Sequence, residues 1–168
     1  MTTAGVWATV ERHLGSRQVA RVIYGAIIGL ALVVAFEAHP PSDGAVAGSL
    51  VATAVAVALA EVYSEVVGTE TRTRRRVRQE ELAHFWHDAV AVFFGVGFPA
   101  VFFVLAMAGA LETDTAFTLA KWSGVGLIGF YGFCAARLAG AGLPRSLLQA
   151  FAVAAVGAVL IGVKALLH

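Results

Sequence analysis

The sequence predicts an all-α fold: a polytopic membrane protein built as a bundle of five transmembrane helices, with a short N-terminal helix in the membrane interface. Three observations predict this class. The 168 residues are 59% hydrophobic and only 14% charged, whereas a soluble domain carries about 25% charged residues. Apolar stretches of about 20 residues, the length that crosses a bilayer, recur along the chain. Proline-, glycine- and charge-rich turns separate these stretches.

Residues 1–18 have the pattern of a helix that lies flat on a membrane. Val6, Trp7, Val10 and Leu14 recur at helical spacing, with charged residues between them. Basic residues ahead of an apolar stretch also resemble a signal peptide, but no small-x-small cleavage site follows. We therefore expect 1–18 to be interfacial and the next apolar segment to be retained as a first span.

The remaining chain, 19–168, is expected to form one transmembrane domain. In the first span, Arg21 and Glu37 lie near the two ends, where both could reach lipid headgroups. In the third span, Pro99 follows two glycines at the centre and should bend the helix, because proline deletes a backbone hydrogen bond. The five spans are predicted at about 19–38, 45–67, 86–111, 115–137 and 146–167.

The connectors between the spans support these boundaries. The Pro40-Pro41 pair cannot continue a helix. The segment 69–81 is polar and contains five arginines, so it must lie in water or among headgroups. Glu112 begins a short polar turn, and Pro144 follows a glycine-rich one. The basic connector is the predicted lipid-facing loop, and its arginines are Arg72, Arg74, Arg75, Arg76 and Arg78.

The distribution of basic residues predicts the orientation. Ten of the twelve lysines and arginines lie in the N-terminal tail and in the connectors after the second and fourth spans; the others are Lys121 and Lys164. Basic residues concentrate on the cytoplasmic side of membrane proteins. We therefore expect an integral protein of a bacterial cytoplasmic membrane, with its N-terminus in the cytoplasm and its C-terminus outside.

Two carboxylates near the cytoplasmic end of the second span are the first candidate site. Glu61 and Glu65 are four residues apart and share one helical face. Glu61 lies about seven residues inside the span, about 10 Å from its end at 1.5 Å per residue. Such a charge needs a partner, a proton or a cation. Either the glutamates form structural ion pairs with nearby arginines or a neighbouring helix, or they form an ion or proton site.

A second candidate lies at the start of the third span. Glu81, His84 and Asp88 share one helical face and offer oxygen and imidazole ligands for a divalent transition metal. Glu81 and His84 also fit a Glu-x-x-His pattern, but the second copy that di-iron bundles require is absent. The alternative is an interfacial belt of polar side chains around Trp86.

Small residues predict where helices approach closely. The glycines concerned are Gly25, Gly29, Gly126, Gly129 and Gly132. They exceed what a small bundle needs, so we expect a homodimer. The net charge of +1 does not suggest nucleic-acid binding. Nucleophile-elbow, phosphate-loop, paired-cysteine and His-Glu-x-x-His motifs do not occur in the sequence, and an enzyme is not expected.

Three segments give the chain a resemblance to the vacuolar iron transporter family, and the resemblance extends over nearly all five spans. The segments are Ile23-Tyr-Gly-Ala-Ile-Ile-Gly29, Ala60-Glu-Val-Tyr-Ser64 and Gly95-Val-Gly-Phe-Pro99. The resemblance implies a dimeric transporter that exchanges Fe²⁺ or Mn²⁺ for protons, with Glu61 as the matching glutamate. The chain departs from the family in having Ile28 where members carry an aspartate. It also lacks the carboxylate-rich insertion between the second and third spans.

The sequence therefore predicts a small divalent-metal or proton transporter that uses Glu61, Glu65 and the Glu81/His84/Asp88 group. The alternative is a membrane interaction protein that does not transport. Its glycine edges would then bind partner helices, and its arginines would bind anionic lipid.

Overall fold

The structure, a computed structural model, describes residues 16–167, all of whose regular elements are α-helices. This confirms the predicted all-α class. The predicted interfacial helix at 1–18 lies outside the described residues except for its last three, which begin α2. The helices are α2 (Ser16–Ala38), α3 (Asp43–Thr73), α4 (Gln79–Gly97), α5 (Ala100–Met107), α6 (Thr113–Leu138) and α7 (Leu143–Leu167).

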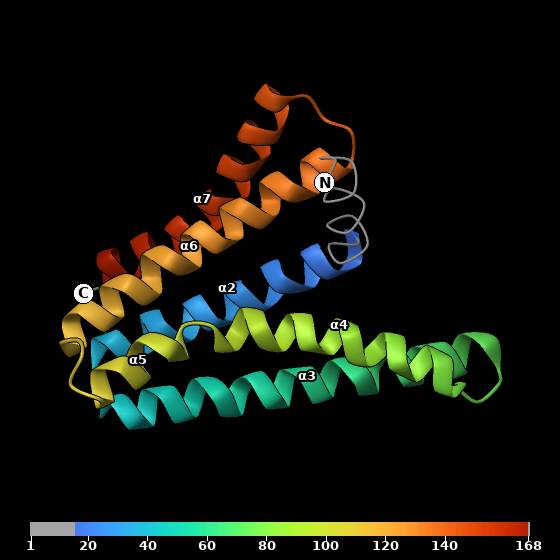
Figure 1. The fold of residues 1–168 in the computed structure, drawn as a ribbon, viewed down its shortest axis with the longest axis horizontal. Coiled ribbons are helices and arrows are strands. Elements are labelled where there is room, and N and C mark those ends of the chain that lie inside the picture. Colours follow the sequence, from blue (N-terminus) through green and yellow to red (C-terminus); the bar gives the residue numbers. More distant parts are fainter. Residues whose placement is uncertain (1–15, 168) are drawn as a thin grey trace, which may run out of the picture.

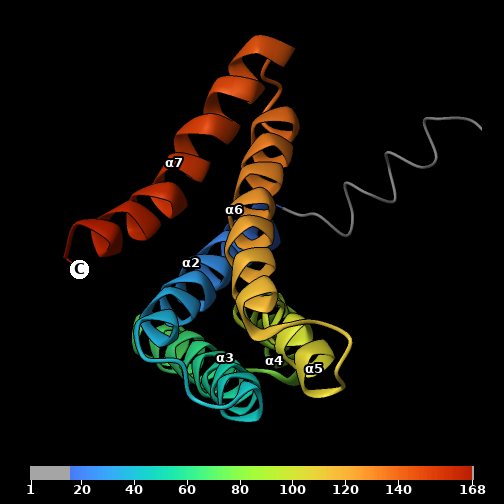
Figure 2. The same cartoon turned by 90° about the vertical axis from the view of Figure 1, so that its left-hand side faces the viewer.

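The long helices lie side by side and alternate in direction along the chain (Figure 1). Helix α2 is central and packs against α4 on one side and α6 on the other. Helix α3 packs on α4, and α7 packs on α6. Figure 2 shows α7 on the far side of α6 from α3 and α5. The α3–α4 pair extends beyond the start of α2, so the basic connector lies at the tip of a helical hairpin.

Two of these helices, α2 and α3, are long and apolar enough to cross a membrane. Helices α4 and α5 meet the same test only as a pair, which is bent by 50°. In α7 the apolar stretch Leu143–Val159 is shorter. The structure thus has two or three helices that could span a bilayer by length and composition.

The bend between α4 and α5 is where the sequence predicts it. Pro99 lies in the two-residue break, and the amide of Phe102 donates to the Pro99 carbonyl at 3.2 Å in a tight turn. The bend directs α5 onto α3 and α6. Helix α5 ends at Met107, before the predicted end of the span. Gly109 with φ of 74° then turns the chain, a conformation that favours glycine.

Three buried clusters hold the bundle together, and the smallest joins Ala54 of α3 with Val92 and Val96 of α4. Phe103 of α5 stacks edge-on against Phe117 of α6, with ring centroids 4.8 Å apart. Both rings are buried in one cluster with Leu50 of α3. In the second cluster, Leu30 of α2 packs with Ile128 of α6. If these helices lie in a bilayer, moving an apolar side chain from lipid into the bundle gains little free energy, and the close van der Waals packing of the rings is what stabilises the contact.

Glycines bring α2 and α4 into backbone contact. A Cβ atom on Gly95 would lie 2.5 Å from the Val22 carbonyl oxygen, and one on Gly29 would lie 2.7 Å from the Val96 carbonyl oxygen. Gly25 faces the same surface of α4. The prediction of close packing at Gly25 and Gly29 is confirmed, and α4 is the helix they accommodate.

Two of the three predicted packing glycines of α6 face α7. Gly129 and Gly132 face Ala154 and Val153 of α7, and a Cβ atom on either glycine would lie 3.4 or 3.3 Å from them, respectively. Gly126 instead faces open space, and nothing within the described chain lies within 4 Å of a Cβ atom built on it. Each three-residue step along α6 rotates the side-chain direction by about 60° at 100° per residue, so Gly126 and Gly132 point about 120° apart and Gly126 lies away from α7.

Candidate functional site

A cluster of four charged side chains lies where α2, α3 and α4 meet. The guanidinium of Arg21 forms ion pairs with Glu61 and with Glu65, the latter at 2.5 Å. The same guanidinium lies 4.0 Å from the carboxylate of Asp88. One cation from the first helix is therefore surrounded by carboxylates from two others. We call these residues the Arg21 cluster.

The positions of these side chains follow from two helix registers. Glu61 and Glu65 share a face of α3, as their spacing predicts. Helices α2 and α4 run in the same direction (Figure 1), and their glycine contact fixes the offset between them. Arg21 lies four residues before Gly25 and Asp88 seven residues before Gly95, so their backbones are offset by about 4.5 Å along the axis at 1.5 Å per residue; the long Arg21 side chain, which tilts toward the helix N-terminus, spans this offset.

The Arg21 cluster contains more negative than positive charge. Its side chains are 11–24% exposed, with Asp88 and Glu61 the most enclosed. Three carboxylates face one guanidinium, so full ionisation would leave an uncompensated charge of two in a mostly enclosed site. An enclosed net negative charge of this size is costly unless a counter-ion compensates it.

Glu81 and His84 lie outside the cluster, although the sequence groups them with Asp88. Glu81 is bound by both terminal nitrogens of Arg75, at 2.6 and 2.9 Å, and accepts from the Arg78 amide at 2.9 Å. The hydrogen bond from Arg75 lowers the pKa of Glu81 to about 2. His84 is exposed, and its Nδ1 lies 3.2 Å from the Glu80 carbonyl oxygen.

The predicted five-residue candidate site is thus divided in two. Glu81 and His84 lie about two turns and one turn nearer the connector than Asp88, where Glu81 is bound by Arg75 and His84 is exposed beside the Glu80 carbonyl. Across residues 16–167, no group of three or more histidines, cysteines, aspartates or glutamates is arranged to hold a metal ion. A guanidinium lies among the carboxylates that do converge.

Sequence reasoning missed Arg21, which it assigned to the lipid headgroups. Its side chain turns inward because Glu61 and Glu65 lie on the facing surface of α3. The signal that could have found it is the pair of small-residue motifs, since aligning Gly25 with Gly95 in parallel helices places Arg21 within one turn of Asp88, inside the reach of an arginine side chain. Pairing of Glu61 with a neighbouring helix, one of the two sequence-based alternatives, agrees with this geometry.

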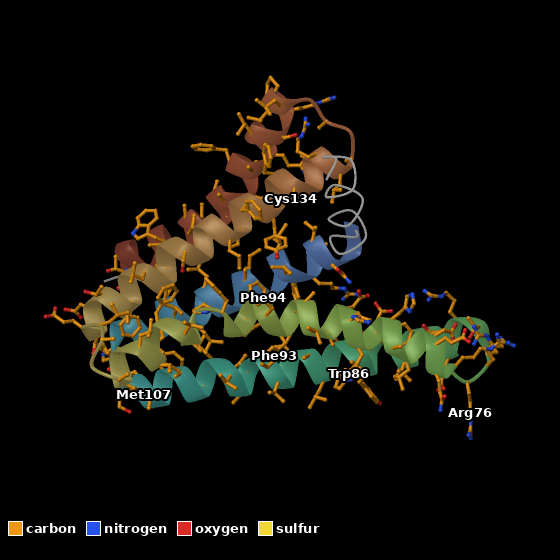
Figure 3. All side chains as sticks on the ribbon, in the orientation of Figure 1. Arg76, Trp86, Phe93, Phe94, Met107 and Cys134 are labelled. Atoms are coloured by element: carbon orange, nitrogen blue, oxygen red, sulfur yellow. The ribbon has the colours of Figure 1, made fainter. Side chains whose placement is uncertain are left out.

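The basic connector lies at the tip of the α3–α4 hairpin, where its arginines are exposed. Figure 3 places Arg76 at the end farthest from Met107. Arg74 caps the C-terminus of α3, with a left-handed φ of 53° and an amide that donates to the Glu70 carbonyl at 2.8 Å. Glu70 also accepts from the Val77 amide, so the turn is held by its own side chains.

A smaller charged group lies at the opposite end of the bundle. Lys121 of α6 pairs with Glu37 of α2 at 2.5 Å. Thr113 donates to one carboxylate oxygen of Asp43 at 3.2 Å. Glu37, predicted to reach the headgroups, is thus tied to a neighbouring helix.

Comparison with known protein families, with curated proteins and with solved structures gives no match for this chain.

Proposed function

We propose that the chain crosses the membrane five times, with its N-terminus in the cytoplasm. Helix direction supports this proposal: α2, α3, α4–α5, α6 and α7 alternate in direction from one to the next, although α6 and α7 are inclined to α3 and α4 (Figure 1). Helices α6 and α7 contain 26 and 25 residues, about 39 and 37 Å at 1.5 Å per residue, enough to cross a core of about 30 Å. The arginine-rich tip would then lie in the cytoplasm.

Within this arrangement we propose a small cation transporter in which the Arg21 cluster binds the transported ion or a proton. The observation that supports it is the ratio of three carboxylates to one guanidinium in a mostly enclosed site. In the unloaded state, Arg21 compensates part of the negative charge. Protons or a substrate cation would compensate the remainder.

The resemblance to vacuolar iron transporters suggests Fe²⁺ or Mn²⁺ as substrate, exchanged for protons. Carboxylate oxygens suit Mn²⁺. Because Arg21 contacts Glu61 and Glu65 directly, a divalent ion would have to displace the guanidinium from at least one of them. Arg21 would then act as a tethered counter-ion that competes with the substrate.

The second candidate is a membrane interaction protein that does not transport. The observation that favours it is the completeness of the ion pairs between Arg21, Glu61 and Glu65, which need no ligand to join two helices. In that case the cluster serves stability and helix register alone.

The substitution Glu61→Gln separates the two candidates, because it removes a charge and keeps the shape. In a transporter, Glu61→Gln should fold and lose pH-driven Mn²⁺ or Fe²⁺ flux in proteoliposomes. It should also lose any rise in melting temperature that the metal produces in the wild type. Glu37→Gln, at the other end of the bundle, is the control and should keep both. Wild-type liposomes without flux of divalent metals or protons would eliminate transport and leave the interaction protein.

Cysteine accessibility tests the orientation. With Cys134 replaced, a cysteine at Thr73 should resist an impermeant thiol reagent in intact cells, and one at His168 should react. The opposite pattern would invert the topology.

The homodimer remains a prediction. Four of the five glycines that suggested it pack within the chain, and among these five only Gly126 is free of contacts within 4 Å. Mass measurement in nanodiscs checks it, and a monomer at every concentration would contradict it.

A further inference from the structure

Three apolar hollows lie along the seam between α3 and the α4–α5 pair. The one nearest the connector has a volume of about 370 Å³ and is lined by residues that include Tyr63, Leu82 and Trp86. The next, about 160 Å³, shares Leu59 and Trp86 with it. The third, about 540 Å³, shares Val90 and Phe93 with the second. The shared residues show that the hollows adjoin one another along the seam, and we call the row of three the trough.

The connector end of this trough has the features of a lipid site. Tyr63 is 72% exposed and Trp86 is 56% exposed, and both residue types concentrate at headgroup depth. The first two hollows extend from Val55 to Val66 along α3. This stretch corresponds to about 16 Å, close to one leaflet of a core about 30 Å thick. This length suits a single acyl chain.

Positive charge lies directly beyond that end. The amide of Leu82 donates to the Arg78 carbonyl at 3.0 Å, which places Arg78 one turn before Leu82. Arg78, Leu82 and Trp86 follow at four-residue intervals and share one face. Figure 3 shows Arg76, Trp86 and Phe93 in this order along the hairpin. Across 69–81, five arginines exceed three glutamates.

We propose that this trough binds an anionic phospholipid. One acyl chain lies against Leu59, Tyr63 and Trp86, and the phosphate group lies against the exposed arginines Arg74, Arg76 and Arg78. A zwitterionic lipid fits the apolar part equally well but lacks the net negative charge that the connector attracts. The proposal rests on the membrane placement of the hairpin and is independent of ion transport.

Quenching of Trp86 fluorescence by brominated lipids tests the proposal. Trp7→Phe with Trp122→Phe leaves Trp86 as the only tryptophan of the full chain. This single-tryptophan variant is reconstituted in phosphatidylcholine vesicles that contain a small fraction of either acyl-brominated phosphatidylglycerol or acyl-brominated phosphatidylcholine. One arginine near an anionic surface corresponds to about a fivefold change in binding. Half-maximal quenching should therefore need at least about fivefold less of the anionic lipid, and the preference should weaken in high salt.

Matched variants connect the preference to this site. Substituting Arg74, Arg76 and Arg78 by glutamine should abolish it, whereas Glu80→Gln, which adds net positive charge, should strengthen it. A variant in which Trp122 is the only tryptophan reports on ordinary boundary lipid. Its fluorescence should be quenched equally by the anionic and the zwitterionic brominated lipid. Equal quenching by the two lipids at Trp86, or an equal preference at Trp122, would overturn the proposal. If Trp86 became less accessible to quenching by either lipid as the protein density in the vesicles rose, the trough would be assigned to a second copy of the chain instead.

Discussion

The substitution Arg21→Gln tests most directly whether the Arg21 cluster carries unbalanced negative charge. It removes the guanidinium and leaves Glu61, Glu65 and Asp88 facing one another between three helices. At 4.0 Å from Asp88, one charge interaction amounts to about 4 kcal/mol at an effective dielectric constant of about 20. Breaking an enclosed pair by removing one partner costs about 3–5 kcal/mol.

We therefore expect Arg21→Gln to lower the free energy of unfolding by about 3–5 kcal/mol at neutral pH. For a chain of this length, that corresponds to a fall of roughly 6–20 °C in melting temperature. The loss should diminish as the pH is lowered toward about 5, because protons then replace the missing guanidinium and relieve repulsion between the carboxylates. Mn²⁺ should raise the melting temperature of the variant more than that of the wild type.

Thermal unfolding in detergent or nanodiscs, followed by circular dichroism between pH 5 and 8, measures these effects. Arg72→Gln, which removes an exposed charge at the hairpin tip, is the control and should change stability by less than about 1 kcal/mol. An Arg21→Gln protein as stable as the wild type throughout this pH range would refute the reasoning. A destabilised variant that neither acid nor Mn²⁺ restores would show that Arg21 acts by packing rather than by charge.

Three further predictions concern packing and the hairpin tip. Gly95→Ala should destabilise the bundle by at least about 1–3 kcal/mol, because its Cβ atom would meet backbone atoms of α2. Gly126→Ala, whose Cβ atom would meet nothing, should be tolerated, and the melting temperatures of the two variants measure the difference. Glu81→Gln should weaken protection of the connector amides from hydrogen exchange above pH about 4.5. The difference from wild type should shrink as the pH falls through about 2, the lowered pKa at which native Glu81 itself takes up a proton and loses its ion pair. Phe103→Ala should cost about 3–5 kcal/mol through the cavity it leaves, and Phe151→Ala, 80% exposed, should cost little.

Much of the helical architecture could be predicted because it depends on local pattern. Five apolar segments, the Pro40-Pro41 turn and the bend at Pro99 correspond to observed helices, a turn and a break. These features arise within one or two turns of chain, from backbone geometry and from the length of apolar runs. The close approach at Gly25 and Gly29 could also be predicted, since only small residues permit backbone contact.

The candidate site could be predicted only in part. The spacing of Glu61 and Glu65 identifies a shared face, and the structure places both in the Arg21 cluster. The same kind of reasoning grouped Glu81 and His84 with Asp88, but Arg75 binds Glu81 and His84 is exposed beside the Glu80 carbonyl. Sharing a face of one helix does not determine which neighbouring helix lies opposite each turn.

The sequence by itself determined the helical class, the apolar segments and the position of the basic hairpin tip, because each depends on neighbouring residues and their hydropathy. Only the tertiary structure decided that Arg21 turns inward, that Asp88 joins Glu61 and that Gly126 stays uncovered. These facts depend on the offset between α2 and α4 and on the rotation of α6 about its axis. Both result from the fit of side chains across helix interfaces, and a shift of one residue rotates a helix face by about 100°.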